Sequence, residues 1–120
     1  MRALGVIGGG AWGTALAQVL AAGGTPVRLW ARNAEVVEAI NGRNENVDYL
    51  PGQALSPLIR ADSDPQALGD AAALLVVTPA QHMRAVLARF TPNGQPLILC
   101  SKGIEAHTRK FMHEVAREAM

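Results

Sequence analysis

Three glycines near the start of the chain have a spacing that suits phosphate binding. They form Gly8-x-Gly10-x-x-Gly13, between an apolar run at Ala3–Ile7 and an alanine-rich helical pattern. In such a strand-turn-helix the first glycine permits a tight turn, the second lets backbone approach a pyrophosphate, and the third allows close helix-strand packing. The partial positive charge of a helix N-terminus also favours a diphosphate. The motif predicts a dinucleotide-binding loop; the alternative is a purely structural glycine turn.

The residues after the loop favour an ordered helix over a flexible linker. Gly23-Gly24 supplies a stop at the far end of the pattern. Large apolar residues recur between these points at helical spacing, at Trp12, Leu16, Val19 and Leu20. This stripe predicts a helix that buries these side chains against a sheet.

An arginine follows the second apolar run, Pro26–Trp30, where a dinucleotide-binding domain contacts the adenosine ribose. NAD-selective sites commonly place an acid there, whereas an arginine suits a 2′-phosphate. No carboxylate stands at positions 31 to 33. Arg32 therefore favours NADP(H), with NAD(H) still open. The alternative is a solvated arginine, with Asn33 acting only as a helix cap.

Two further candidates follow the apolar runs Ala72–Val77 and Pro96–Cys100. Pro79 can form an apolar wall near the nicotinamide, or it can simply begin the next helix. Lys102 can bind a substrate phosphate or hydroxyl and, if desolvated, transfer a proton, although most lysines are solvated and do neither. Both residues would follow strands at the carboxyl edge of a parallel sheet, where open α/β sheets bind ligands.

The alternation of apolar runs with helical patterns predicts the fold class. The four runs above are typical of strands buried on both faces. A weaker strand is expected around Leu58–Ala61. Asn33 can cap a helix running to about Asn41, and Asp64-Pro65 can begin another. The order indicates an α/β fold of the Rossmann type, doubly wound, with a mostly parallel sheet and helices on both faces.

Composition excludes several classes of partner. Eleven basic residues balance ten acidic ones in 120 residues and form no run, which gives no electrostatic case for nucleic acid. The apolar runs are too short to span a bilayer, so membrane insertion is not expected. Cys100, the single cysteine, lies in an apolar run, which indicates a buried thiol in a reducing cytoplasm. No metal site is expected, because metal-ligand spacing is lacking among His82, His107 and His113.

Five segments, in this order and at these separations, carry a resemblance to a known family: Val6–Ala17, Leu29–Arg32, Asn46–Gly52, Val77–Gln81 and Ser101–Glu105. They resemble the N-terminal domain of bacterial NAD(P)-dependent glycerol-3-phosphate dehydrogenases, over nearly the whole chain. The glycine loop is common to many dehydrogenases, whereas the tyrosine-leucine-proline and lysine-glycine segments are far more specific. Ala11 and Thr78-Pro79-Ala80 depart from the family's commoner serine and proline-serine choices.

The resemblance implies reversible hydride transfer between NAD(P)H and dihydroxyacetone phosphate, giving sn-glycerol 3-phosphate for glycerophospholipid synthesis. Lys102 would lie between nicotinamide and substrate and contact the substrate. The other implied cofactor contacts come from the pyrophosphate loop, the adenosine ribose end and the long loop, namely Ala11 and Trp12, Arg32 and Asn33, and Tyr49.

In this family a helical C-terminal domain supplies the principal proton-transfer lysine and most substrate-phosphate contacts. That domain is absent here, so residues 1–120 are expected to form one NAD(P)-binding Rossmann domain, cut before its last strands, with no catalytic residue assigned. Alone, it should bind cofactor weakly at most and show no turnover. A homodimer is one expectation for the complete protein. The alternatives are a non-catalytic dinucleotide-sensing module and another NADP-dependent 3-hydroxyacid or ketopantoate-type reductase.

Overall fold

A parallel sheet organises the residues that the computed structural model describes, which are 2–47, 49–78, 82–90 and 94–100. Its five strands lie in the order β3-β2-β1-β4-β5, and every neighbouring pair is parallel. Each predicted apolar run contains or overlaps one strand, so the prediction of the strands is confirmed. Their bounds are β1 Leu4–Ile7, β2 Val27–Trp30, β3 Ile59–Asp62, β4 Leu74–Val76 and β5 Leu97–Leu99.

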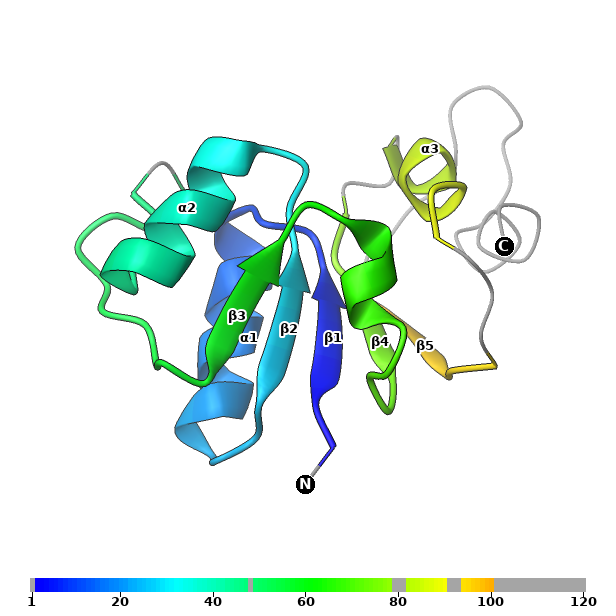
Figure 1. The fold of residues 1–120 in the computed structure, drawn as a ribbon, viewed down its shortest axis with the longest axis horizontal. Coiled ribbons are helices and arrows are strands. Elements are labelled where there is room, and N and C mark those ends of the chain that lie inside the picture. Colours follow the sequence, from blue (N-terminus) through cyan, green and yellow to red (C-terminus); the bar gives the residue numbers. More distant parts are fainter. Residues whose placement is uncertain (1, 48, 79–81, 91–93, 101–120) are drawn as a thin grey trace.

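Helices cover both faces of this sheet (Figure 1). Helices α1 (Ala11–Ala22) and α2 (Ala34–Arg43) pack on one face, and the 3-10 helix η1 (Pro65–Leu68) and α3 (Met83–Leu87) pack on the other. Successive residues of β1 alternate between the two cores, with Val6 in the first and Ile7 in the second. The helices after the neighbouring strands β1 and β4 therefore lie on opposite faces, which confirms the doubly wound Rossmann-type fold.

The face of α1 that meets the sheet differs from the prediction. Trp12 and Val19, expected in the buried stripe, are 62% and 69% exposed. The residues that are buried instead are small: Gly13, Thr14, Ala17 and Ala21. The prediction was wrong for Trp12 and Val19, because small side chains let the helix approach the strands closely, whereas Leu20 is partly buried and packs against the core as predicted. The predicted stop is confirmed, since α1 ends at Ala22 with Gly23 as its C-cap.

Strand β5 is less buried than its apolar run indicates. The run predicts a strand covered on both faces, yet Ile98 is 50% exposed. The strand lies at the edge of the described sheet, and α1 and α2 pack against the half formed by β1, β2 and β3. The composition of this run therefore predicts a strand correctly and its burial incorrectly.

Two predicted caps set the direction of the chain as it leaves β2 and β3. Asn33 Oδ1 accepts a hydrogen bond of 2.8 Å from the Glu35 N–H, and α2 begins at the next residue, Ala34. Asp64 Oδ1 accepts one of 3.0 Å from the Gln66 N–H, although the helix that follows is only a short 3-10 helix. Both caps lie at the carboxyl edge of the sheet, where the candidate residues were expected.

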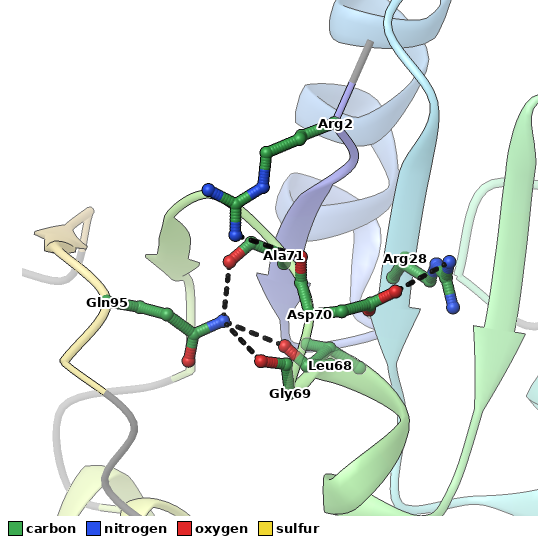
Figure 2. Close-up of polar contacts among 7 residues, drawn as sticks. All are labelled: Arg2, Arg28, Leu68, Gly69, Asp70, Ala71 and Gln95. Carbon is green, nitrogen blue, oxygen red and sulfur yellow. Dashed lines mark hydrogen bonds and ion pairs between the residues drawn. The ribbon is translucent and has the colours of Figure 1, made fainter.

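The turn between η1 and β4 is held by Gln95, just before β5 (Figure 2). Its Nε2 donates to three carbonyl oxygens, those of Leu68 at 3.0 Å, Gly69 at 3.4 Å and Ala71 at 2.6 Å. The same turn carries the ion pair Arg28–Asp70 at 3.2 Å, whose side chains are both exposed. Exposed ion pairs contribute little to stability. The partly buried amide of Gln95 is thus the stronger polar anchor of the turn that leads into β4.

Candidate functional site

The carboxyl ends of three adjacent strands meet at one edge of the sheet. Beyond β1, the Gly8 N–H donates to the Trp30 carbonyl oxygen at 2.9 Å, and beyond β4 the Val77 N–H donates to the Ile7 carbonyl oxygen at 2.9 Å. The segments that begin at Gly8, Ala31 and Val77 therefore start side by side. Since β1 and β4 send their helices to opposite faces, this edge is the topological switch point at which open α/β sheets bind ligands.

Three glycines of the loop are required by contacts within the protein. Gly8 has a φ of 134°, and a Cβ there would lie 3.2 Å from the Val77 backbone. A Cβ at Gly13 would lie 2.1 Å from the Gly8 carbonyl oxygen, and one at Gly9 would lie 2.6 Å from the Ala31 Cβ. The turn at Gly8 and the close packing at Gly13 are the geometry that the motif predicts.

Gly10 differs from its neighbours because no residue in the described part of the chain crowds it. A Cβ at this position would meet no described atom within 4 Å. Gly10 is the N-cap of α1, makes no side-chain cap, and is followed by a first turn without acidic residues. The exposed side chains of Ala11 and Trp12 come next. The positive end of the helix therefore opens onto free space that a phosphate group could occupy.

Arg32 and Asn33 lie at the end of β2, both exposed. Asn33 uses its side-chain oxygen as the cap of α2, as noted above. The indole Nε1 of Trp30 donates to the Ser63 carbonyl oxygen at 3.0 Å, which ties the end of β2 to the chain beyond β3. The backbone that carries Arg32 is thus firmly held. Arg32 follows β2 and Val77 follows β4, and β1 lies between these two strands.

Asn46 is a buried polar residue beside the glycine loop to which sequence analysis assigns no role. Its side chain is fully buried, and its Nδ2 donates to the Gly9 carbonyl oxygen and to Thr14 Oγ1, both at 2.8 Å. Its Oδ1 accepts from the Tyr49 N–H at 3.3 Å. The only sequence signal for it is its place in the family-like segment Asn46–Gly52, where it reads as an ordinary turn residue.

The other predicted site residues divide into two groups. Tyr49 lies in the loop after α2, and its side chain is 50% exposed. Pro79 and Lys102 lie outside the described residues. Just before Pro79, Thr78 is 4% exposed and its Oγ1 donates to the Ile7 carbonyl oxygen at 3.3 Å. Thr78 thus holds the end of β4 against β1 from within.

The residues with other reactive side chains form no site in the described part of the chain. Partial burial raises the pKa of the Cys100 thiol above its ordinary value, so the group is a neutral thiol near pH 7. His82 is exposed at the start of α3. Within the described ranges, no group of His, Cys, Asp and Glu could hold a metal ion, and no helix is long and apolar enough to cross a membrane.

A doubly wound parallel sheet with a glycine-rich loop at its switch point defines a domain of the Rossmann class. Comparison with known families narrows the class. The family model described as NAD-dependent glycerol-3-phosphate dehydrogenase N-terminus matches residues 3–120, so the chain belongs to this family.

Individual relatives agree with this assignment. Glycerol-3-phosphate dehydrogenase (NAD(P)+) 1 of Sphingopyxis alaskensis is 53% identical over 117 residues, and the Caulobacter vibrioides enzyme of the same kind is 52% identical over 120 residues. Each match covers 98% of this chain and 36% of the relative, so the chain spans about a third of the length of these curated relatives. The crystal structure of glycerol-3-phosphate dehydrogenase from Coxiella burnetii superposes with a TM-score of 0.86 at 27% identity, covering 98% of this chain and 37% of that one.

Proposed function

We propose that this chain is the cofactor-binding part of an enzyme that reversibly reduces dihydroxyacetone phosphate to sn-glycerol 3-phosphate. The cofactor would be NADP(H) in preference to NAD(H), and the reaction would serve glycerophospholipid synthesis in the cytoplasm. The observation that carries the proposal is the open space at Gly10, beside the N-terminus of α1, in a chain whose family model matches residues 3–120.

The described residues fit a dinucleotide at this edge. A diphosphate beside Gly10 would meet backbone N–H groups and the positive end of a helix of 12 residues, without needing a basic side chain. Gly8, Gly9 and Gly13 hold the loop in its shape by contacts inside the protein. In the proposal, Ala11 and Trp12 border the pyrophosphate, and Tyr49 approaches the cofactor from the loop that Asn46 holds.

The chemistry of the reaction assigns a limited part to this chain. When bound, the reduced nicotinamide supplies a hydride to the carbonyl carbon, and the ketone oxygen gains a proton. The chain's own residues hold the dinucleotide, so that the reacting atoms can meet in one orientation. We assign Pro79 to an apolar wall beside the nicotinamide and Lys102 to the substrate phosphate or hydroxyl. The proton donor is assigned to residues beyond these 120.

Lys102→Ala in the full-length protein tests whether this is an enzyme or a sensor of dinucleotides. Loss of a charged hydrogen bond to the substrate should lower kcat/KM for dihydroxyacetone phosphate by about ten- to a hundredfold. NADPH affinity, measured by fluorescence titration, should change little. Lys110→Ala is the matched control. Unchanged kcat/KM in the Lys102 variant would remove Lys102 from the substrate site. A wild-type protein that binds NADPH without any reductase activity would favour the sensing module.

Arg32→Ala tests the preference for NADP(H). Removal of the guanidinium should weaken NADPH binding by about ten- to a hundredfold, because a charge-assisted contact with the 2′-phosphate is lost. NADH, which lacks that phosphate, should bind as before. Titration of both cofactors against the full-length protein measures the difference. Arg60→Ala, which removes an exposed arginine from β3, is the control. If NADPH affinity is untouched, Arg32 is a solvated surface residue.

A further inference from the structure

The side-chain amide of Asn46 hydrogen-bonds three groups, which lie in the glycine loop, the first turn of α1 and the Tyr49 loop. Its Nδ2 has two hydrogens, and the two acceptors at 2.8 Å are the Gly9 carbonyl oxygen and Thr14 Oγ1. The Thr14 hydroxyl lies 3.4 Å from the same Gly9 carbonyl oxygen and donates to it. Asn46 is 0% exposed and Thr14 is 0% exposed, so water cannot replace these bonds. Loss of either partner would leave buried polar groups unsatisfied.

These bonds determine which way the peptide between Gly9 and Gly10 faces. The carbonyl and N–H of a trans peptide point in opposite directions, and no cis peptide occurs in the described residues. The Gly9 carbonyl oxygen is directed inward, to Asn46 and Thr14. The Gly10 N–H is therefore directed away from Asn46 and Thr14, and a Cβ added at Gly10 would meet no described atom within 4 Å. Glycine is flexible enough to turn this peptide over, so hydrogen-bond donors outside the loop are needed to hold the Gly9 carbonyl oxygen in its inward position.

Asn46 also sets the position of the loop that carries Tyr49. Its Oδ1 accepts from the Tyr49 N–H at 3.3 Å, and its backbone carbonyl oxygen accepts from the Leu50 N–H at 2.8 Å. The loop is fastened further along, where the Ser56 N–H donates to Gln18 Oε1 of α1 at 2.7 Å. One buried side chain thus connects the glycine loop, the first turn of α1 and the Tyr49 loop.

We infer that Asn46 is a positioning residue for dinucleotide binding: its amide fixes the Gly9–Gly10 peptide with the N–H toward the cofactor phosphate and places Tyr49 beside it. This inference rests on the proposed cofactor function and adds a residue to it. Asn46 itself makes no contact with the ligand in this arrangement. It acts through the orientation of a peptide whose glycines cannot hold that orientation themselves.

Asn46→Asp keeps the size of the side chain and replaces its NH2 donor by an oxygen, which carries a negative charge when the carboxyl group is ionised. The uncharged Thr14→Ser and Thr14→Val variants test the same hydrogen bonds without that charge. An ionised carboxylate can accept from Thr14 and Tyr49 but would face the Gly9 carbonyl oxygen without a hydrogen to donate. A buried carboxyl group has a raised pKa, and when protonated it can donate to Gly9 as the amide does.

We expect the full-length Asn46→Asp protein to bind NADPH about tenfold more weakly than the wild type at pH 8, with most of the deficit removed at pH 6. Asn41→Asp is the matched control. Asn41 Nδ2 donates to the Ala61 carbonyl oxygen at 2.9 Å and its Oδ1 accepts from the Ala61 N–H at 2.8 Å, between α2 and β3. The Asn41→Asp substitution removes a similar side-chain amide hydrogen bond at a place away from the glycine loop. NADPH affinity of this variant should therefore stay at the wild-type value at both pH values.

An Asn46→Asp deficit that is absent, that is equal at both pH values, or that Asn41→Asp reproduces would overturn the inference. If the Asn46 variant does not fold, Thr14 supplies the answer instead. Thr14→Ser keeps the hydroxyl that Asn46 contacts and should bind NADPH as the wild type does, whereas Thr14→Val should bind it about tenfold more weakly. Equal affinities of these two variants would also overturn it. A wild-type protein that binds neither NADPH nor NADH would instead contradict the proposed function.

Discussion

Gly13→Ala should destabilise the protein by about 3 kcal/mol or more, because its Cβ would make the closest contact of any Cβ added at a described glycine. The new Cβ would lie 2.1 Å from the Gly8 carbonyl oxygen, which is backbone and cannot rotate away as a side chain could. Gly8 is itself restrained, because its N–H bonds to the Trp30 carbonyl oxygen at 2.9 Å. Helix α1 would have to move off β1. The midpoint of thermal unfolding, followed by circular dichroism, measures the loss.

Gly42→Ala is the control for this change of residue type. Gly42 lies within α2, and a Cβ there would meet no described atom within 4 Å. Alanine favours a helix over glycine by about 0.5–1 kcal/mol, so this variant should melt at a slightly higher temperature. A Gly13→Ala protein that melts with the wild type would show that α1 and β1 are not packed as closely as the structure indicates.

Gly10→Ala should produce the opposite pattern, with cofactor affinity lost and stability kept. Gly10 has a φ of −75°, which alanine adopts without strain, and its Cβ would have open space around it. Alanine is a poorer N-cap than glycine, at a cost below about 1 kcal/mol. In the proposed site the methyl group would occupy the place of the approaching pyrophosphate, so NADPH should bind about tenfold more weakly or worse. Fluorescence titration of the full-length protein measures this affinity.

The comparison between Gly10 and Gly13 separates two uses of the same motif. A glycine kept for internal packing shows its effect in the unfolding midpoint, with or without ligand. A glycine kept for a ligand shows its effect only when the ligand is titrated. Wild-type NADPH affinity in Gly10→Ala would assign the whole motif to the fold and would remove the main support for the proposed site.

The sheet could be predicted from sequence because parallel strands that are covered by helices on both faces consist of continuous runs of apolar residues. Val6 and Ile7 are adjacent and both fully buried, one in each core, so no polar residue interrupts the run. The start of α2 was predictable for a local reason as well. Asn33 caps it by accepting from the Glu35 N–H, and both residues of this contact lie within a few positions of each other in the sequence.

Other features depend on contacts between residues that are far apart in the sequence, and local sequence patterns do not reveal such contacts. Asn46 bonds to Thr14 and Gly9, 32 and 37 residues earlier in the chain, and its residue type suggests only a turn. Trp12 was predicted to be buried because it is far more hydrophobic than Ala17 and Ala21, although these two alanines are the residues that pack against the sheet. Burial of Ile98 depends on which strand lies at the sheet edge, and composition does not record strand order.

The near contact between Gly9 and Ala31 limits how this domain can acquire a new cofactor preference. A Cβ at Gly9 would lie only 2.6 Å from the Ala31 Cβ, and Ala31 is 3% exposed. A longer side chain at position 31 would therefore clash with its surroundings and displace the glycine turn. Arg32 and Asn33 are exposed and carry no such restriction. Divergence toward either dinucleotide, in evolution or by protein engineering, has room at positions 32 and 33 while position 31 stays small.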